Sequence, residues 1–336
     1  IWVYADDGSE TVFEATPFIK DQYGNFKSAE KIYWPDGKEN LNFTAFWPSP
    51  ERLNTDADRE YCQSLSGYNN DSHQKLTLTP NTKLVTFENS RNAFYHYDFI
   101  SATQYVSKNQ SNKGITLNFK HALAQIEFRA KIDKGAEHRV EISSIVLCNI
   151  NRSSNYSITE NNWNITANNR RDVFSAPLNK LTLTEEYASL TTKTGPIFLA
   201  PQNLVFEDYS KTENTKGTIL YVYGQVYKND NLIFPTLDWT DEEKNHRIMK
   251  PDKMDNINQL INPNNLELGI LRIQLGTTPL ELEAGHKYIF TIDFTNGVGF
   301  YGKSDPTYPG EPIINHSLSA KVDIEEWAEN NQQADA

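Results

Sequence analysis

The stretch Ile115-Thr-Leu-Asn-Phe119 carries the pattern that indicates the fold of this chain. Its apolar residues at 115, 117 and 119 alternate with polar residues at 116 and 118. A period of two places the apolar side chains on one face of an extended backbone, which is typical of a half-buried β-strand. We therefore predict a strand here and look for the same period elsewhere.

The alternation recurs along the whole sequence. It is found over residues 41–46, 76–78, 140–142, 181–183, 219–227, 268–275, 288–294 and 318–324. Turn-forming groups separate these stretches, for example Asp36-Gly37 and Asn229-Asp-Asn231. Many short strands with Asn-rich turns, and no regular exchange of strands with helices, predict an all-β protein made of sandwiches.

The length of the chain, 336 residues, allows two domains that each have a core. The polar, Asn-rich run over residues 161–171 follows a series of strands and predicts a boundary near residue 168. We therefore expect an N-terminal β-sandwich domain over 1–168 and a C-terminal β-sandwich domain over 169–336. Two short helices are also predicted, over 56–65 and 252–261.

Charge and cysteine content limit the functions that are open to this chain. Its formal net charge of -12 and its scattered basic residues argue against nucleic acid as a partner, because phosphates would be repelled. Cys62 and Cys148 are too few for a disulfide framework, and whether they pair stays open. No stretch reaches the ~18 apolar residues that a membrane-spanning helix needs.

One stretch formally matches a phosphate-binding loop. Gly297-Val-Gly-Phe-Tyr-Gly-Lys-Ser304 has the glycine, four residues and Gly-Lys-Ser of that motif. Nucleotide binding also requires a helix that begins at the lysine, whose N-terminus cradles the phosphates. Pro306, Pro309 and Pro312 follow instead and forbid that helix. The stretch therefore predicts the end of a strand followed by a proline-containing loop.

No other group of residues points to catalysis, a cofactor or a metal. The seven histidines include no pair at zinc spacing, and neither cysteine has a neighbouring histidine. The acidic groups Asp56/Asp58 and 241–243 lack the ligand order of a calcium loop. We expect His121 to be packed or surface-exposed rather than catalytic. The prediction is a non-enzymatic protein with no catalytic, cofactor-binding or metal-binding residues.

A set of segments occurs in a characteristic order along the chain: Ile32–Pro35, Leu41–Pro48, Tyr97–Ala102, Ile115–Phe128, Ser144–Ile150, Trp163, Phe198–Gln202, Glu283–Tyr288 and Ile324–Trp327. In this order they resemble the fimbrillin-like family of Bacteroidales surface pili. The most specific is Ile115–Phe128, which is similar to the family's H-A-L-A stretch. The segment 300–314 is longer than the loop that the family has before its last strand.

The resemblance implies two transthyretin-like Greek-key β-sandwich domains in tandem. It also implies an exported lipoprotein displayed at the cell surface, attached to the outer membrane through a lipidated N-terminus that is absent from this chain. Its partners would be other pilin subunits, and stalk subunits of the family polymerise when a neighbour donates a strand to the groove left by a removed N-terminal strand. Whether this chain is a stalk, anchor or tip subunit stays open.

The two terminal stretches are the candidates for such an exchange. The candidate residues are Thr11, Val12, Phe13, Leu318, Ala320, Val322, Ile324 and Trp327. Burial of five or six apolar side chains would contribute on the order of 10 kcal/mol before ordering costs. The alternative, that both stretches are ordinary strands of their own subunit, stays open.

A second function is also compatible with the sequence. Aromatic residues make up 12% of the chain and its formal net charge is -12, and both are compatible with a protein that binds a ligand at the cell surface. A surface lipoprotein that never polymerises and binds a glycan or a host protein is therefore kept as the alternative.

Overall fold

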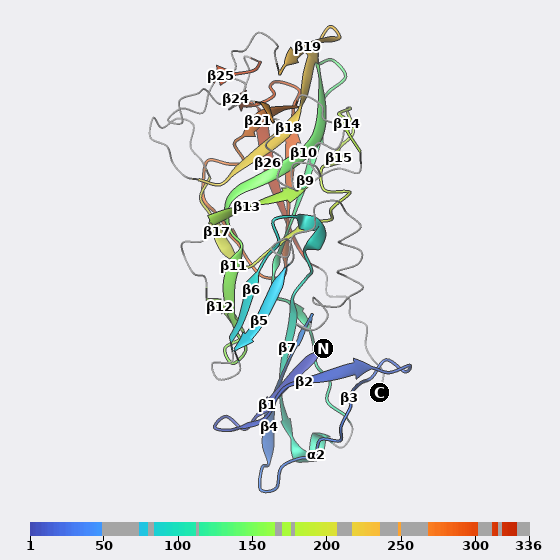
Figure 1. Cartoon of the computed structure of the whole chain (residues 1–336), viewed down its shortest axis with the longest axis vertical. Coiled ribbons are helices and arrows are strands. Elements are labelled where there is room, and N and C mark those ends of the chain that lie inside the picture. Colours follow the sequence, from blue (N-terminus) through green and yellow to red (C-terminus); the bar gives the residue numbers. More distant parts are fainter. Residues whose placement is uncertain are drawn as a thin grey trace.

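The structure, a computed structural model, describes residues 1–48, 74–79, 84–111, 114–164, 170–175, 179–206, 217–235, 248–249, 268–301, 311–314 and 318–327. In these residues the protein consists of β-strands, a short helix α2 (Lys108–Ser111) and one 3-10 turn (Ala93–Tyr95) (Figure 1). The prediction of an all-β protein is confirmed. The predicted helices over 56–65 and 252–261 lie outside the described residues.

A six-stranded antiparallel sheet forms the lower end of the molecule in Figure 1, with the strand order β3-β2-β1-β4-β7-β8. Its strands are β1 (Trp2–Asp6), β2 (Thr11–Lys20), β3 (Phe26–Ser28), β4 (Asn40–Trp47), β7 (Ile100–Ser107) and β8 (Lys120–His121). We call it the N-terminal sheet. The alternation predicted over 41–46 lies in β4, where Leu41, Ala45 and Phe46 are buried.

A four-stranded sheet packs against one face of the N-terminal sheet. Its order is β12-β11-β6-β5, from β5 (Lys75–Thr79), β6 (Leu84–Glu88), β11 (Ser153–Ser157) and β12 (Asn162–Asn164). Tyr4, Phe46 and Phe99 meet Phe87 and Tyr156 in one buried aromatic cluster between the two sheets. The ring centroids of Phe99 and Tyr156 lie 5.0 Å apart in an edge-to-face arrangement, which aromatic pairs prefer.

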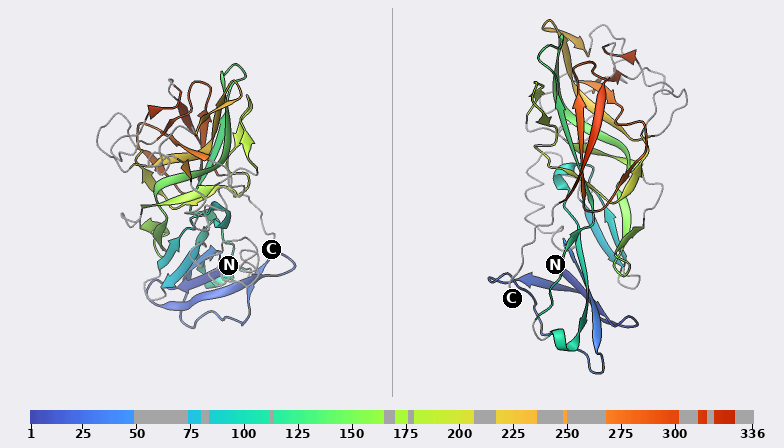
Figure 2. Two further views of the ribbon diagram at one scale, coloured as in Figure 1. Left: turned by 45° about the horizontal axis from the view of Figure 1, so that its top comes forward. Right: turned by 180° about the vertical axis from the view of Figure 1, so that it is seen from behind.

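The upper part of the molecule holds a nine-stranded and a five-stranded sheet (Figure 2). The first contains β10 (His138–Asn151), β13 (Arg170–Ser175), β14 (Leu181–Thr182), β18 (Ile219–Lys228), β19 (Asn231–Phe234), β20 (Ile248–Met249), β21 (Leu268–Ile273), β24 (Phe300–Tyr301) and β25 (Glu311–Pro312). The second contains β9 (Ala124–Lys131), β15 (Ala188–Ser189), β16 (Ile197–Leu199), β23 (His286–Asp293) and β26 (Ser319–Glu326). β17 (Gln202–Leu204) pairs with β22 (Leu280–Leu282) in a separate ribbon.

The largest apolar core lies between these two upper sheets. Phe128 of β9 and Phe290 of β23 stack with centroids 5.2 Å apart, opposite Ile145 of β10 and Val222 of β18. β9 and β23 are parallel neighbours, whereas the other pairs in these sheets are antiparallel. β9 and β10 precede residue 168 in the sequence, yet they pair with β23 and β18, which follow it. The expected boundary near residue 168 stays a prediction.

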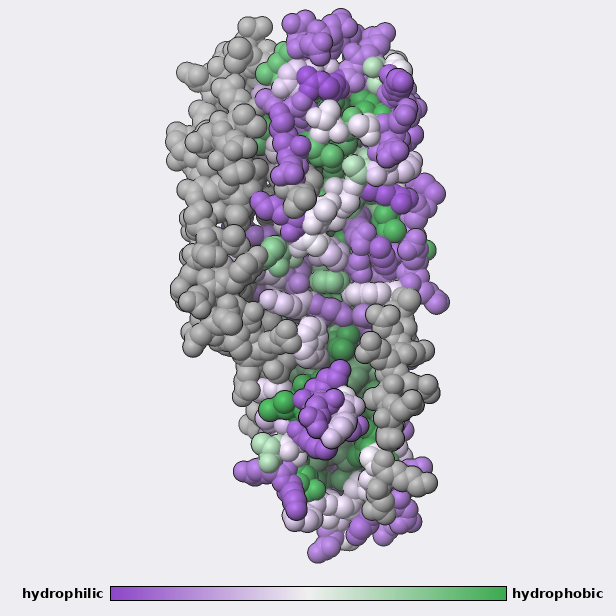
Figure 3. All heavy atoms as spheres, turned by 90° about the vertical axis from the view of Figure 1, so that its right-hand side faces the viewer, coloured by the Kyte–Doolittle hydropathy of each residue, from purple (hydrophilic) through white to green (hydrophobic). Residues whose placement is uncertain are grey.

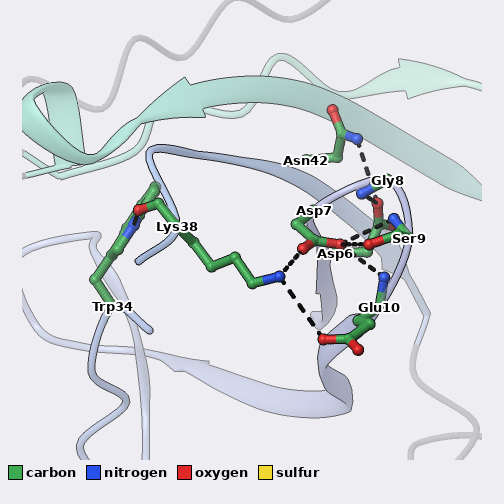
Figure 4. Close-up of polar contacts among 8 residues, drawn as sticks. All are labelled: Asp6, Asp7, Gly8, Ser9, Glu10, Trp34, Lys38 and Asn42. Atoms are coloured by element: carbon green, nitrogen blue, oxygen red, sulfur yellow. Dashed lines mark hydrogen bonds and ion pairs between the residues drawn. The ribbon is translucent and has the colours of Figure 1, made fainter. Parts of the chain in front are cut away.

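The turn between β1 and β2 is fixed to the loop that precedes β4 (Figure 4). The Asp7 carboxylate accepts hydrogen bonds from the N–H groups of Ser9 and Glu10 at 2.9 and 2.7 Å, and it forms an ion pair with Lys38. The Lys38 ammonium, together with these N–H groups, holds the pKa of Asp7 well below its usual range. The indole N–H of Trp34 donates to the Lys38 carbonyl at 2.6 Å within the same loop, and the Trp34 ring lies 6.1 Å from that of Phe43 in β4, so the loop also packs on the sheet.

Candidate functional site

The first candidate stretch, Thr11 to Phe13, begins strand β2 and pairs with β1. Val12 and Phe13 are half-buried on the apolar face of the N-terminal sheet, and the Phe13 ring lies 6.1 Å from that of Phe43. β3 covers only residues 18–20 of β2. The other side of residues 11–17 has no strand partner among the described residues, so this part of β2 is an edge.

The second candidate stretch forms β26, which pairs with β23 without a register shift from Ser319 to Glu326. Val322 lies opposite Phe290 and packs on the core, as does Leu318 just before the strand. Ala320 is half-buried, whereas Ile324 is 53% exposed. Within the described part of the chain, no strand lies beyond β26, so it forms the outer edge of the five-stranded sheet.

Trp327, the last candidate residue, stacks on two aromatic rings. Its ring lies 3.7 Å from that of His121 and 5.4 Å from that of Phe198, and the three planes are within 6° of parallel. The Trp327 N–H donates to the Gly285 carbonyl at 2.8 Å. The Asp98 carboxylate lies 2.6 Å from Nδ1 of His121 and orients the imidazole. We call Trp327, His121 and Phe198 the tryptophan clamp; it ties the end of β26 to β8 and β16.

Removing the clamp should loosen the C-terminal strand. We expect Trp327→Ala to lower the free energy of unfolding by about 2 kcal/mol, less than for a fully buried tryptophan because this ring is only half-buried. Urea denaturation measures this loss. Ile324→Ala is the matched control on the same strand, and it should cost less than about 0.5 kcal/mol. Equal losses in the two variants would show that the stacked rings add nothing to the free energy of unfolding.

A buried polar network lies beside the clamp. His96 accepts the N–H of Phe198 on Nδ1 at 3.1 Å, so its proton is on Nε2, which lies 2.9 Å from the Ser90 carbonyl. The amide of Asn89 donates to the Phe198 carbonyl. Burial lowers the pKa of His96 from 6.5 to about 4, and the nearby Arg152 acts in the same direction. These bonds connect the loop after β6 to β16.

The remaining predictions from the sequence concern metal ions, membrane helices, a phosphate-binding loop and the cysteines. They hold no cluster of His, Cys, Asp and Glu that would suit a metal ion. No helix in that part of the chain is long and apolar enough to cross a membrane. In the stretch that resembles a phosphate-binding loop, Phe300 and Tyr301 form β24, and residues 302–304 lie outside the described residues. Cys148 is buried in β10, and Cys62 lies outside the described residues as well.

Large apolar side chains are exposed around the β2–β3 hairpin. They are Ile19 (70%), Tyr23 (76%), Phe26 (42%), Ile32 (41%) and Tyr33 (78%). Figure 3 shows hydrophobic residues at the surface in this lower part of the molecule. Exposed apolar side chains that form a contiguous patch can serve as a contact surface. The sequence did not predict this exposure, because an aromatic residue in a strand gives the same pattern whether its side chain faces the core or the solvent.

These features define a class of protein: a β-rich chain whose notable sites are strand edges and exposed aromatic residues. Residues 1–327 match the fimbrillin-like family, and the chain belongs to that family. The resemblance seen in the sequence is thereby confirmed. The family is structural and non-enzymatic.

Solved structures share the fold at low sequence identity. One is a fimbrial protein from Bacteroides vulgatus ATCC 8482, with 11% identity and a TM-score of 0.53 over 97% of this chain and 92% of that chain. Another is a candidate cell adhesion protein from Bacteroides uniformis ATCC 8492, with 12% identity and a TM-score of 0.50 over 97% and 91%. No match is found among curated protein sequences.

Proposed function

We propose that this chain is a structural subunit of a cell-surface fimbria and that it joins neighbouring subunits by strand donation. The observation that carries the proposal is the match to the fimbrillin-like family over residues 1–327. The edge at residues 11–17 of β2 supports it, because an unpaired edge offers main-chain donors and acceptors to an added strand. Attachment to the outer membrane through a lipidated N-terminus is part of the same proposal.

We further infer that the sheets form two transthyretin-like sandwiches in tandem. Separate apolar clusters support this: one joins the N-terminal sheet to the four-stranded sheet, and a larger one lies between the two upper sheets. The strand pairs β10–β18 and β9–β23 suggest that the second sandwich begins near β9, earlier than residue 168. β11 and β12 follow β9 and β10 in the sequence but belong to the four-stranded sheet, so the test uses the whole chain. Two sandwiches that fold independently should give two transitions in calorimetry, whereas a single cooperative transition would contradict the division.

Polymerisation is the direct test of strand donation. We expect the protein with its native N-terminal extension to form filaments and an SDS-resistant ladder on unboiled gels after treatment with an Arg- or Lys-specific protease. The untreated protein is the control and should remain monomeric. A chain that stays monomeric after complete cleavage would contradict a stalk role and favour an anchor, a tip or a surface binder.

The alternative function, a non-polymerising adhesin for a glycan or a host protein, is favoured by the exposed aromatic residues. Tyr23 and Tyr33 are more than three-quarters exposed, and flat rings that face solvent can stack on sugars or on another protein. A glycan array would show selective binding that Tyr23→Ala and Tyr33→Ala abolish. The array should show no such binding if the chain is purely structural.

A further inference from the structure

Strand β7 is an edge of the N-terminal sheet over most of its length. β4 covers its inner side from Ile100 to Ser107, but β8 covers its outer side only at Ile100 and Ser101. Lys108 N–H donates to the Glu39 carbonyl on the β4 side. Because main-chain groups alternate along a strand, those of Thr103 and Tyr105 and the N–H of Ser107 point outward.

Two glutamine side chains occupy part of this outer edge. Nε2 of Gln104 donates to the Tyr105 carbonyl at 3.2 Å, and the Ser107 N–H donates to Oε1 of Gln110 at 3.1 Å. An amide side chain offers the same donor and acceptor as a peptide group. The glutamines therefore stand where the main chain of a neighbouring strand would lie. The N–H and C=O of Thr103 and the N–H of Tyr105 have no partner among the described residues.

Residues 115–119, which would extend β8 along β7 and complete the sheet, pair with no strand in the described parts of the chain. Extension of the β7–β8 register would set Phe119 opposite Ala102 and Ile115 opposite Val106. Instead, residues 115–119 have no main-chain hydrogen bond within the described parts of the chain. Their apolar side chains are half-buried on the face of the N-terminal sheet, while Thr116 and Asn118 are exposed. The segment has the side-chain pattern of a strand without the pairing of one.

The edge also lacks the charges that normally protect such strands. Residues 100–107 and 114–119 contain no charged side chain, although 23% of the chain is charged. The edge strand β26, by contrast, carries Lys321, Asp323 and Glu325. Natural edge strands use charges to prevent pairing with another chain. An uncharged edge also lets a second copy of a chain with net charge -12 approach without bringing carboxylates together.

We infer that the outer edge of β7, residues 102–107, is an acceptor site for an extended segment of a second copy of this chain. The incoming strand would displace the Gln104 and Gln110 side chains and bond to Thr103 and Tyr105. Its alternate apolar side chains would cover Ile115, Leu117 and Phe119 on the face of the N-terminal sheet. This inference rests on the proposed fimbrial function and adds the place of contact.

Charges placed on this edge test the inference. The double variant Gln104→Lys/Tyr105→Lys puts one lysine on each face of β7, at positions that are both exposed. The matched control Asn231→Lys/Leu232→Lys adds the same charge at exposed positions of the β18–β19 hairpin, at the other end of the molecule (Figure 1). We expect the assembled fraction after protease activation to fall at least ~10-fold in the first variant and to be unchanged in the control. Circular dichroism and Tm verify that both variants fold.

Hydrogen exchange on the wild-type protein gives a second readout that needs no variant. The amides of Thr103 and Tyr105 should exchange at least ~10-fold more slowly in the assembly than in the monomer. The edge is not the acceptor if the wild type assembles while the edge variant assembles equally well and these amides stay unprotected. The fimbrial function still stands in that case. Protection already present in the monomer would show that residues 115–119 close the edge, which also overturns the inference. A wild-type chain that never assembles overturns the inference together with the stalk role.

Discussion

Phe290→Ala is expected to lower the free energy of unfolding by about 3–5 kcal/mol. The Phe290 side chain is fully buried on β23, stacked 5.2 Å from Phe128 and 6.4 Å from the edge-on ring of Phe206. Alanine would leave a cavity at the centre of the largest core, where the surrounding strands are fixed by their ladders and cannot collapse into it. Urea denaturation followed by circular dichroism measures the loss.

The conservative variant Phe290→Leu serves as the control. It retains most of the apolar volume, so its loss should be about 1–1.5 kcal/mol. A loss below about 1.5 kcal/mol for Phe290→Ala would mean that the two upper sheets do not share this core.

Acid should weaken the fold through His96. In the folded protein its pKa is about 4, against 6.5 for the ordinary side chain. Between these values the unfolded chain binds a proton on this residue that the folded chain does not, so the free energy of unfolding falls as pH falls from 6.5 towards 4. The stability that His96 contributes is present above pH 6.5, and about 3 kcal/mol of it is lost by pH 4.

The variant His96→Gln isolates this contribution from that of other titrating groups. It should be less stable than the wild type at pH 7, because it loses the packed ring, but its stability should fall less steeply between pH 6.5 and 4. Phe290→Leu, which destabilises the fold without removing a titrating group, is the control and should keep the slope of the wild type. Parallel pH profiles for the wild type and His96→Gln would contradict the role given to His96.

Most of the stretches that were predicted as strands from their alternation are strands in the structure. The stretches 219–227, 288–294 and 318–324 correspond to β18, β23 and β26, because period-two burial is a property of neighbouring residues. The predicted turn at Asn229-Asp-Asn231 joins β18 to β19, and Asn229 and Asp230 have the positive φ angles that such turns require.

These local patterns did not predict which strands pair with each other. Ile115–Phe119 alternates as predicted and buries its apolar side as predicted, yet it joins no ladder among the described residues. Alternation states which side of a strand is apolar, but the partner is chosen by contacts far away in sequence.

The tryptophan clamp shows the same limit. His121, Phe198 and Trp327 are brought together by the pairing of β7 with β8, β9 with β16, and β23 with β26. His121 was expected to be packed or exposed rather than catalytic, and it lies packed against Trp327. The sequence around each of the three residues does not predict its contact with the other two.

The central claim is that this chain is a subunit of a surface fimbria. Immunogold electron microscopy of cells that produce it, with an antibody raised against the folded chain, tests the claim most directly. We predict gold particles along filaments that extend from the cell surface, and no labelled filaments on cells that lack the chain. Gold spread evenly over the cell envelope, with filaments unlabelled along their length and at their base and tip, would contradict the account.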